Sequence, residues 1–539
     1  MLKTPEPAAA AMTAAELAAP YRIFNDRRSL WAFWVGCGIV TTGVLLHLPM
    51  FWMARDMGFK LAGMPMDTGM FVGMGLIVFG IAVTGYGLLP KTTQPLHREA
   101  ARAVVSPPED APLTVAHWSL MAVLVLALVV DVMKPASLGF VVPGMIREYG
   151  VPKSTVAWLP FAALSGTVVG SVVWGVLADL YGRRASILLS AVMFVGTSIC
   201  GAMPSLWWNV GMCFLMGAAA GGMLPIAYTL LAEAMPSRHR GWCLVLVGGI
   251  GAAGGYLAAS WAASLLQPMF GWRIMWFLNL PTGLLLIVLN GFIPESAKFL
   301  LSLGRSVDAQ GVMRRFGSTV RLLAPGEAED DIAGQAEPRA KRLPVAYIAK
   351  TIALSITGLS WSLVNYGLLL WLPNELMARG YSMGVSSKLI AQSALIALPT
   401  VALTALFYSR WRTKWTLVVM IAMTVAGLAW IYLLVGVGAA HNLLLPVGLL
   451  VVGSNGVLAT LLPYAAENYP LRVRGRATGW VAACSKAGGL ITQALAIMSA
   501  VPGLNIAALL IAAPNVLAMV LISAFGSETK GRDLRDLEH

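Results

Sequence analysis

Two copies of one ten-residue pattern constrain this 539-residue chain more than any other feature. The pattern A-E-x-x-P-x-R-x-R-G occurs over Ala232–Gly241 and again, 234 residues later, over Ala466–Gly475. Each copy ends an apolar stretch that is long enough to form a helix. A charged hinge repeated between apolar segments indicates a membrane protein built from two similar halves.

The composition independently supports a membrane protein. Charged residues make up 12% of the chain and hydrophobic residues 58%, with a mean hydropathy of +0.74, whereas a soluble domain carries about 25% charged residues. The net charge of +13 does not indicate a nucleic-acid partner, because the basic residues lie in short loops between apolar stretches. The five cysteines all lie in apolar runs without metal-ligand spacing, so we expect no disulfide, no metal site and no cofactor.

The apolar stretches predict fourteen membrane-spanning helices, because a span needs roughly 20 apolar residues. The predicted fold class is an all-α membrane protein. The predicted spans are 29–53, 69–90, 116–146, 155–178, 185–203, 206–234, 241–266, 273–293, 346–376, 386–408, 415–436, 442–466, 477–500 and 504–525. The corresponding domains are a tail (1–28), a two-helix extension (29–112), a six-helix bundle (113–294), a linker (295–345), a second six-helix bundle (346–526) and a tail (527–539).

The distribution of basic residues predicts the orientation in the membrane. With both termini in the cytoplasm, 29 of the 38 Lys and Arg residues face the cytoplasm, 7 face outward and 2 lie within spans. Arg27 and Arg28 faintly resemble a twin-arginine export signal, but the apolar run after them is too long and lacks a cleavage site. We therefore expect an integral protein of the plasma membrane, which is the inner membrane of a bacterium.

Four loop motifs resemble those of the major facilitator superfamily. The segment Gly175–Arg184 reads G-V-L-A-D-L-Y-G-R-R, which is similar to the family's loop between its second and third helices. The twin A-E-x-x-P-x-R-x-R-G segments resemble loops after helices four and ten of its sugar-porter and organic-ion branches. Pro294–Ser296 and Glu528–Arg532 resemble the P-E-S and P-E-T-K-G signatures. The resemblance covers about residues 113–535 and implies two six-helix bundles that transport a solute by alternating access.

The same motifs suggest a cytoplasmic gate. A carboxylate at a helix end can pair with Arg or face a helix N-terminus when that side is closed, and Gly175 is expected to let two helices approach closely. The alternative is that these residues only anchor the loops. In the second half Ser409 and Arg412 replace the Asp and Gly of the motif, so the lock there is weakened or rebuilt. The candidate gate residues are Gly175, Asp179, Gly182, Arg183, Arg184, Glu233, Arg238, Arg240, Glu467, Arg472 and Arg474.

Charged residues inside the spans indicate a candidate substrate and proton site. Asp131 and Lys134 share one helix face, and Asp131 lies about 20 Å from the helix start. A charge at that depth costs roughly 2.5–3.5 kcal/mol, so it usually faces a cavity or a partner. The pattern Asp131-x-x-Lys134 followed by Pro143 resembles the D-x-x-D…P motif of aromatic acid/proton symporters, with Lys in place of the second Asp. An internal Asp131–Lys134 ion pair without a transport role is the alternative.

A third charge lies about 15 Å into a later span. Lys486, together with Lys134, favours an anionic substrate; pairing with a backbone carbonyl is the alternative. The polar residues that complete the candidate site are Tyr228, Asn365, Tyr366, Gln392 and Asn455, with Trp158, Trp361 and Trp371 as possible stacking partners for an aromatic ring. Each of these alone is more often a packing residue.

The sequence therefore predicts proton-coupled uptake of a small organic anion, aromatic acids included. The alternatives are a proton-driven drug or metabolite exporter, a sugar or polyol porter, and a membrane receptor that binds without translocation. The run Gly248–Gly255 lacks the Pro of many drug antiporters, and Cys213 stands where they carry Arg. No phosphate-binding loop, metalloprotease motif or nucleophile elbow is present, so an enzyme is not expected. The expected partners are the substrate, protons and the lipid bilayer; the oligomeric state stays open.

Overall fold

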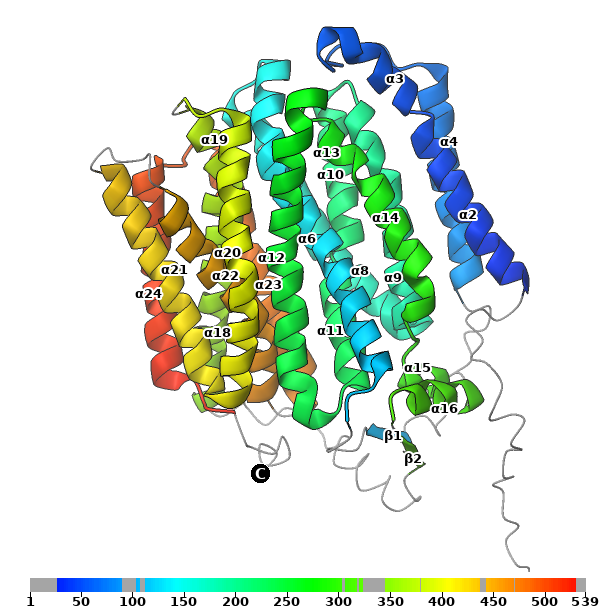
Figure 1. The fold of residues 1–539 in the computed structure, drawn as a ribbon, viewed down its shortest axis with the longest axis vertical. Helices are drawn as coiled ribbons and strands as arrows, with labels where there is room; N and C mark the ends of the chain where they lie inside the picture. Colours follow the sequence, from blue (N-terminus) through cyan, green and yellow to red (C-terminus); the bar gives the residue numbers. More distant parts are fainter. Residues whose placement is uncertain are drawn as a thin grey trace, which may run out of the picture.

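The computed structural model describes residues 27–89, 103–106, 112–302, 306–317, 319–322, 345–378, 380–436, 443–469 and 471–529. Within these residues, fourteen helical segments are long and apolar enough to cross a membrane. This confirms the predicted fold class, an all-α membrane protein with fourteen spans. Figure 1 shows the helices running roughly parallel, with α3 at one end of the molecule and α15, α16 and two short strands at the other. These ends are called the α3 end and the α15 end below.

Two of the spans form the extension, which lies along the flank of the molecule (Figure 1). It consists of α2 (Arg27–Leu45), α3 (Leu48–Met53), the short helix η1 (Ala54–Met57) and α4 (Thr68–Leu88). Glycines let α2 and α4 approach closely, since a Cβ added to Gly43 would lie 2.7 Å from the Gly73 carbonyl oxygen. The side-chain Oδ1 of Asp67 accepts the Met70 N–H at 2.8 Å and caps α4. Both helices pack against α9.

The next helices form the first bundle. They are α6 (Val115–Tyr149), α7 (Lys153–Val156), α8 (Trp158–Tyr181), α9 (Arg183–Gly196), η2 (Thr197–Ala202), α10 (Leu206–Ala220), α11 (Met223–Ala234), α12 (Ser237–Phe270), α13 (Ile274–Phe277), α14 (Asn279–Val288) and η3 (Leu289–Phe292). The helix α6 begins with a capping box, in which Thr114 and His117 satisfy each other's backbone groups. It contains Pro135 and Pro143 in its interior, each of which removes a helical hydrogen bond.

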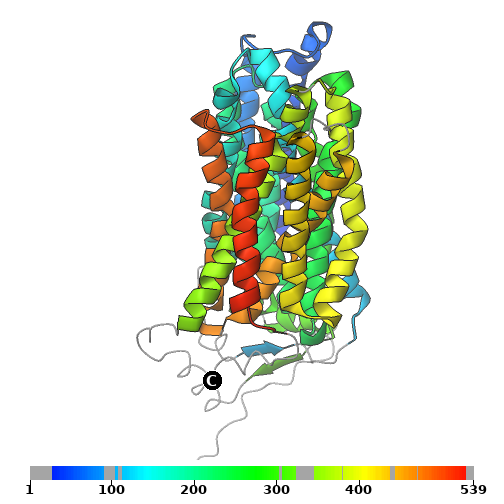
Figure 2. The same ribbon diagram turned by 90° about the vertical axis from the view of Figure 1, so that its left-hand side faces the viewer.

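The polar stretch between the bundles contains ordered elements. The helices α15 (Ala297–Ser302) and α16 (Ser306–Arg315) are followed by β2 (Thr319–Leu322). This strand pairs antiparallel with β1 (Ala103–Ser106), with Ala103 opposite Leu322. Figure 2 shows the two strands below the helices, at the α15 end. The expectation of an all-α chain therefore holds for the spans, while a small two-stranded sheet joins the two polar connections.

The second bundle comprises α18 (Val345–Ser362), the π-helix η4 (Leu363–Leu369), α19 (Leu370–Ala378), α20 (Met383–Arg410), α21 (Thr413–Gly436), α22 (Leu444–Asn468), α23 (Leu471–Ile497) and α24 (Leu504–Phe525). It meets the first bundle along three lines, where α12 lies against α20 and α22, α8 against α23, and α6 against α19. Small residues allow this contact, since a Cβ added to Gly249 of α12 would lie 2.5 Å from the Val401 side chain of α20.

Candidate transport site and gate

The two charged residues near the middle of α6, Asp131 and Lys134, have different surroundings. Lys134 is buried, and its Nζ lies over the ring of Phe194 on α9, inside the first bundle. The Oδ1 of Asp131 is buried without a hydrogen-bond partner. Among the described residues no ion pair joins Asp131 to Lys134. Lys134 therefore does not form a direct ion pair with the Asp131 carboxylate.

Lys486 of α23 is the cation that approaches Asp131 from the other bundle. The charges of both Lys134 and Lys486 act on the Asp131 carboxylate. The Nζ of Lys486 lies 5.9 Å from the centre of the Tyr366 ring, within reach of a cation–π interaction. No ion-pair partner for Lys486 is found in the described part of the chain. The charges that the sequence singled out therefore act on one another, with Lys134 buried in the first bundle and Lys486 partly exposed in the second.

The π-helix η4 places Asn365 and Tyr366 in a network of hydrogen bonds. The Tyr256 hydroxyl of α12 donates to Asn365 Oδ1 at 3.2 Å, so the first bundle contacts the second through this pair. The Nδ2 of Asn365 donates to Ser454 Oγ and to the Trp361 carbonyl oxygen. π-helical turns are rare and occur often at functional sites, because the wider turn redirects side chains. The network fixes Asn365 at the interface between the bundles.

Sequence reasoning missed three polar residues of this network. Tyr256 was hidden in the glycine-rich run of α12, and Ser454 stands next to the predicted Asn455. Gln493 donates to the Tyr366 carbonyl oxygen and accepts the Trp371 indole N–H at 3.2 Å. A polar side chain in an apolar span was the available signal. Ser and Tyr are too common in spans for it to be specific.

The remaining candidate residues are less well connected. Asn455 is buried, and its Nδ2 has no hydrogen-bond partner. The Tyr228 hydroxyl also lacks a partner and packs against Gly248 of α12. Gln392 is exposed on the face of α20 that carries the exposed Leu395 and Ile396. The structure does not join Gln392 to the three charges by any hydrogen bond among the described residues.

The three candidate tryptophans divide in the same way. Trp361 donates to the Ser454 carbonyl oxygen at 3.0 Å, and its ring meets that of Tyr366 edge-on at 5.9 Å. Trp371 lines a cavity of about 180 Å³ at the α3 end. Trp158 is 38% exposed and packs edge-on against Phe161, so it lies outside the network. Two of the three aromatic side chains are therefore placed near the charges or the adjoining cavity.

An ion pair between two residues that line this cavity joins the two bundles. Lys153 of α7 lies 2.6 Å from Glu375 of α19, and its Nζ is 4.6 Å from the Trp371 ring centre. Their side chains are about one third exposed, so solvent screens the pair and its contribution to stability is small. A contact between the bundles at one end is nevertheless a contact that must change if that end opens. Sequence reasoning did not find this pair, because the two residues lie at separate helix ends.

The gate motif of the first half forms a carboxylate network at the α15 end. Arg183 Nη2 lies 3.0 Å from Glu233 Oε1, which links the motif loop to the first copy of the repeated pattern. The buried Glu295 Oε1 accepts the N–H groups of Arg183 at 2.8 Å and of Ser296 at 2.9 Å. Burial raises the pKa of Glu295, and these backbone donors oppose the shift. Glu295 thereby places negative charge at the N-terminus of α9.

The second half also has a carboxylate at the N-terminus of the helix that follows its motif loop. Glu528 Oε1 accepts from the Thr413 N–H at 2.8 Å and from its hydroxyl at 2.7 Å, at the N-terminus of α21. Glu467 Oε2 accepts from Tyr408 and Thr529, each at 2.7 Å. The structure thus provides negative charge at this helix N-terminus through Glu528, as Glu295 does in the first half.

The two copies of the repeated pattern lie side by side. A Cβ added to Gly241, the last residue of the first copy, would lie 3.3 Å from Glu467 Oε1 of the second copy. Arg184 donates to Asn290 at 2.8 Å, and the Nε of Arg240 is buried without a hydrogen-bond partner. Arg238 is exposed and has an interaction of its own. The side chains of Asp179, Arg472 and Arg474 lie outside the described part of the structure.

The two motif glycines differ in their surroundings, which corrects one expectation. A Cβ added to Gly175 meets nothing within 4 Å, so Gly175 does not mediate a close helix contact. That role belongs to Gly166 and Gly170 of α8, which face backbone atoms of α10. Gly182 has φ +101° and ψ 155°, a conformation that is open essentially to Gly. Its added Cβ would lie 2.5 Å from Glu295 Oε2.

We therefore expect Gly182→Ala to destabilise the protein by about 1–3 kcal/mol, because it strains the backbone and displaces the Glu295 carboxylate. Gly175→Ala is the matched control from the same motif, and it should leave stability unchanged or slightly higher. Thermal unfolding of the two purified variants in detergent measures the difference. Equal melting temperatures for the two variants would show that Glu295 does not depend on the Gly182 turn.

Comparisons with known proteins agree with this arrangement. The family model of the Major Facilitator Superfamily matches residues 120–493. The niacin transporter NiaP of Acinetobacter baylyi is 24% identical over 445 residues, covering 80% of this chain and 99% of the relative. The 4-hydroxybenzoate transporter PcaK of the same species is 27% identical over 400 residues, covering 71% and 84%.

A solved structure of the proton:xylose symporter XylE bound to 6-bromo-6-deoxy-D-glucose shares the fold. It aligns with a TM-score of 0.63 and 19% identity, covering 78% of this chain and 98% of XylE. The two helices of the extension precede the residues that the family model matches. The comparisons confirm that the chain is a transporter and not an enzyme, and it belongs to the major facilitator superfamily.

Proposed function

We propose that this transporter takes up a small organic anion, in particular an aromatic carboxylate, together with protons. The observation that carries the proposal is that the charge of Lys486 of α23 acts on the unpartnered Asp131 carboxylate of α6 across the interface between the bundles. An anion needs a cation, and coupling to protons needs a group that gains and loses one. A charge buried at mid-membrane is usually retained for such a function.

The two lysines would have different roles. Lys134 is enclosed in the first bundle against Phe194, so it would act on Asp131 rather than on the substrate. Lys486 lies nearer the second bundle's aromatic residues, with the Tyr366 ring 5.9 Å away and Trp361 packed edge-on against that ring. If the carboxylate of an aromatic substrate bound Lys486, the ring of that substrate would lie against Tyr366 and Trp361. The unpartnered Nδ2 of Asn455 would orient the substrate, Asn365 would line the site as part of its own hydrogen-bond network, and Tyr228 would line it from the first bundle.

The names of the relatives favour the same substrate class. They include a niacin transporter, a 4-hydroxybenzoate transporter and a gentisate transporter from Corynebacterium glutamicum. Niacin, 4-hydroxybenzoate and gentisate are all small aromatic carboxylates. A sugar substrate is supported less well, because the likeness to XylE, at 19% identity, is one of fold.

In alternating access, the contacts between the bundles would open and close in turn at the α15 end and at the α3 end. At the α15 end the Glu233–Arg183 and Glu467 contacts would change as that end opens, and at the α3 end the Lys153–Glu375 pair would do so. The excess of Lys and Arg in the loops supports an orientation with the α15 end and both termini in the cytoplasm. In a bacterium this corresponds to the inner membrane, as it would for the bacterial relatives.

A ligand-stabilisation screen tests the proposed substrate class. A ligand that binds only the folded state raises the melting temperature, and the rise grows with the logarithm of its concentration relative to its Kd. We expect nicotinate, 4-hydroxybenzoate and gentisate to stabilise the purified protein, and their uncharged amides or alcohols to have little effect. Stabilisation by sugars alone would support the porter alternative. Stabilisation by lipophilic cations alone would support a drug exporter, and either result would contradict the proposal.

A further inference from the structure

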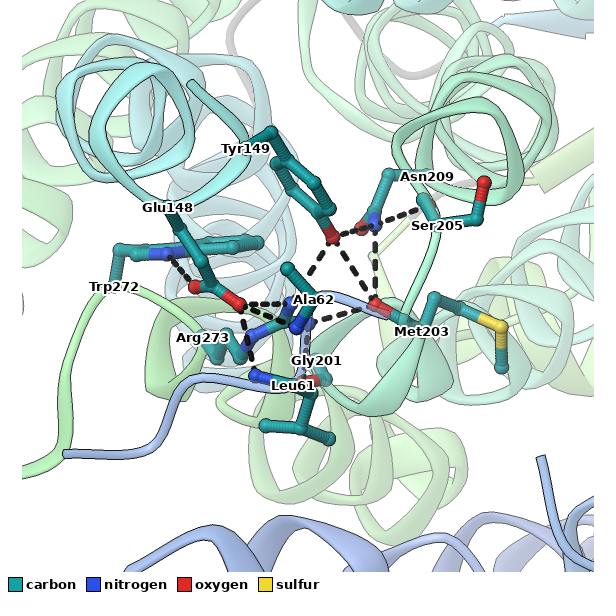
Figure 3. A network of polar contacts seen from close by, with 10 residues as sticks. All are labelled: Leu61, Ala62, Glu148, Tyr149, Gly201, Met203, Ser205, Asn209, Trp272 and Arg273. Atoms are coloured by element: carbon teal, nitrogen blue, oxygen red, sulfur yellow. Dashed lines mark hydrogen bonds and ion pairs between the residues drawn. The ribbon is translucent and has the colours of Figure 1, made fainter. Parts of the chain in front are cut away.

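The extension reaches the first bundle at a buried carboxylate of α6. The turn between η1 and α4 presents two backbone N–H groups to Glu148, which belongs to the last turn of α6 (Figure 3). Glu148 Oε1 accepts the N–H of Leu61 at 2.8 Å and that of Ala62 at 2.9 Å. Neither residue belongs to a span, and no charged residue of the extension takes part in this contact. The extension therefore binds Glu148 through its backbone.

Glu148 is also half of a buried ion pair. Arg273 Nη2 lies 2.7 Å from the same Oε1, and the Arg273 side chain is fully buried. Arg273 Nη1 donates to the carbonyl oxygens of Met203 and Gly201, and the Trp272 indole N–H donates to Glu148 Oε2 at 2.8 Å (Figure 3). A buried ion pair contributes favourably only when its remaining donors and acceptors are satisfied. Two of the four donors to the Glu148 carboxylate come from the extension.

Aromatic packing holds the extension at the same place. The ring of Phe51 stacks on Phe59 at 4.8 Å within the extension and contacts Phe277 of α13 at 4.9 Å. Phe59 meets Phe270 at the end of α12 edge-on at 5.8 Å. The extension is thus joined to the ends of α6, α12 and α13, which all belong to the first bundle.

The end of α6 has a particular need for such a contact. Pro135 and Pro143 each remove a hydrogen bond from this helix, so its regular bonding is interrupted twice between Asp131 and Glu148. Between these interruptions lies Gly139, whose added Cβ would be 2.6 Å from the Leu370 carbonyl oxygen of α19 in the second bundle. The segment of α6 around Gly139 contacts the second bundle, and Glu148 fixes the end of the helix beyond that segment.

We propose that the extension positions the α3-end half of α6, and that Glu148 is the positioning residue through which it does so. The extension then moves with the first bundle as one body and sets how α6 meets α19 when the α3 end closes. This consequence for transport rests on the proposed function. The structural coupling from the extension through α6 to α19 does not rest on it.

The turn allows one donor to be removed selectively. Met64 N–H donates to the Leu61 carbonyl oxygen at 3.1 Å, and Gly63 has φ +81°. These features are typical of a type II turn, whose second position, here Ala62, accepts proline. Ala62→Pro therefore keeps the turn type but replaces an N–H donor to Glu148 by a ring Cδ that displaces the carboxylate, whereas the control Ala62→Ser keeps the N–H.

Hydrogen–deuterium exchange of the full-length protein, purified without substrate, tests the structural coupling. In Ala62→Pro we expect exchange to become roughly tenfold faster over residues 144–149 of α6 and 370–378 of α19, and to stay unchanged in α21. Ala62→Ser should match the unsubstituted protein. Faster exchange confined to residues 27–89, or no change in α6 and α19, would overturn the proposal.

Transport measurements separate positioning from substrate binding. Ala62→Pro should lower the maximal uptake rate several-fold while the stabilisation by bound carboxylate stays the same, because Lys486 and Tyr366 are untouched. An equal loss of ligand stabilisation would contradict a positioning role. If the unsubstituted protein binds no carboxylate, the proposed function fails, whereas the exchange result still decides whether the extension positions α6.

Discussion

Replacing Lys486 by Gln is expected to raise the KM for an aromatic carboxylate roughly tenfold to hundredfold. Lys486 has no ion-pair partner among the described residues and lies beside the Tyr366 ring at the interface between the bundles. A hydrogen bond to a charged group contributes roughly 1.5–3 kcal/mol, and each 1.4 kcal/mol is about a tenfold change in affinity. Gln keeps a hydrogen-bond donor but removes the positive charge. The loss of substrate affinity therefore measures the contribution of the charge of Lys486.

Initial uptake rates in proteoliposomes over a range of substrate concentrations measure this effect. Lys414→Gln is the matched control, because Lys414 also lies beside an aromatic ring, that of Trp415, but near the start of α21. It should keep the KM of the unsubstituted protein. Lys486→Arg should recover part of the affinity, since the charge is retained with a different shape. An unchanged KM in Lys486→Gln would remove Lys486 from the substrate site.

The spans were predictable from the sequence because the bilayer leaves few choices. Backbone groups in hydrocarbon must be hydrogen-bonded within the segment, so each long apolar run forms a helix. The short elements were not predictable in the same way. The pairing of β1 with β2 joins segments more than 200 residues apart, and the π-helix η4 departs from the regular period without a Gly or Pro at its start.

The sequence was enough to predict which residues belong to the candidate site, but not where their side chains point. Hydropathy identified Asp131, Lys134 and Lys486 because a charge in an apolar run is conspicuous. The sequence placed Asp131 and Lys134 on one helix face, but it did not show that Lys134 lies against Phe194 inside the first bundle. Gln392 looked equivalent to Asn365, yet it lies on an exposed face of α20. Side-chain direction depends on the rotation of each helix, which is set by packing against its neighbours.

The most deeply buried ion pair of the described residues escaped sequence analysis altogether. Glu148 and Arg273 lie at span ends, where charged residues normally face solvent, so neither is conspicuous. In the folded chain first-bundle groups surround Arg273, and the turn of the extension adds two N–H donors to Glu148. The second-half gate shows the same effect, because Glu528 follows the last span and reaches Thr413 only in the folded chain.

Asp131→Asn is expected to separate substrate movement from proton movement. Asn has nearly the shape of Asp but does not titrate between pH 5 and 8. The Asp131 carboxylate has a buried oxygen without a hydrogen-bond partner and is acted on by both lysines, so in the proposed function it would be the group that exchanges a proton. Without it, Lys486 would still bind the anion. The variant should therefore equilibrate substrate down its gradient but lose accumulation driven by protons.

The decisive measurement is the accumulation of a labelled aromatic carboxylate in sealed proteoliposomes under an acid-outside gradient. In the unsubstituted protein the internal concentration should exceed the external one several-fold, and the excess should vanish when the gradient is collapsed. In Asp131→Asn the two concentrations should become equal with or without the gradient. Accumulation by Asp131→Asn that still depends fully on the gradient would contradict a proton-coupling role for Asp131, and so would the absence of accumulation by the unsubstituted protein.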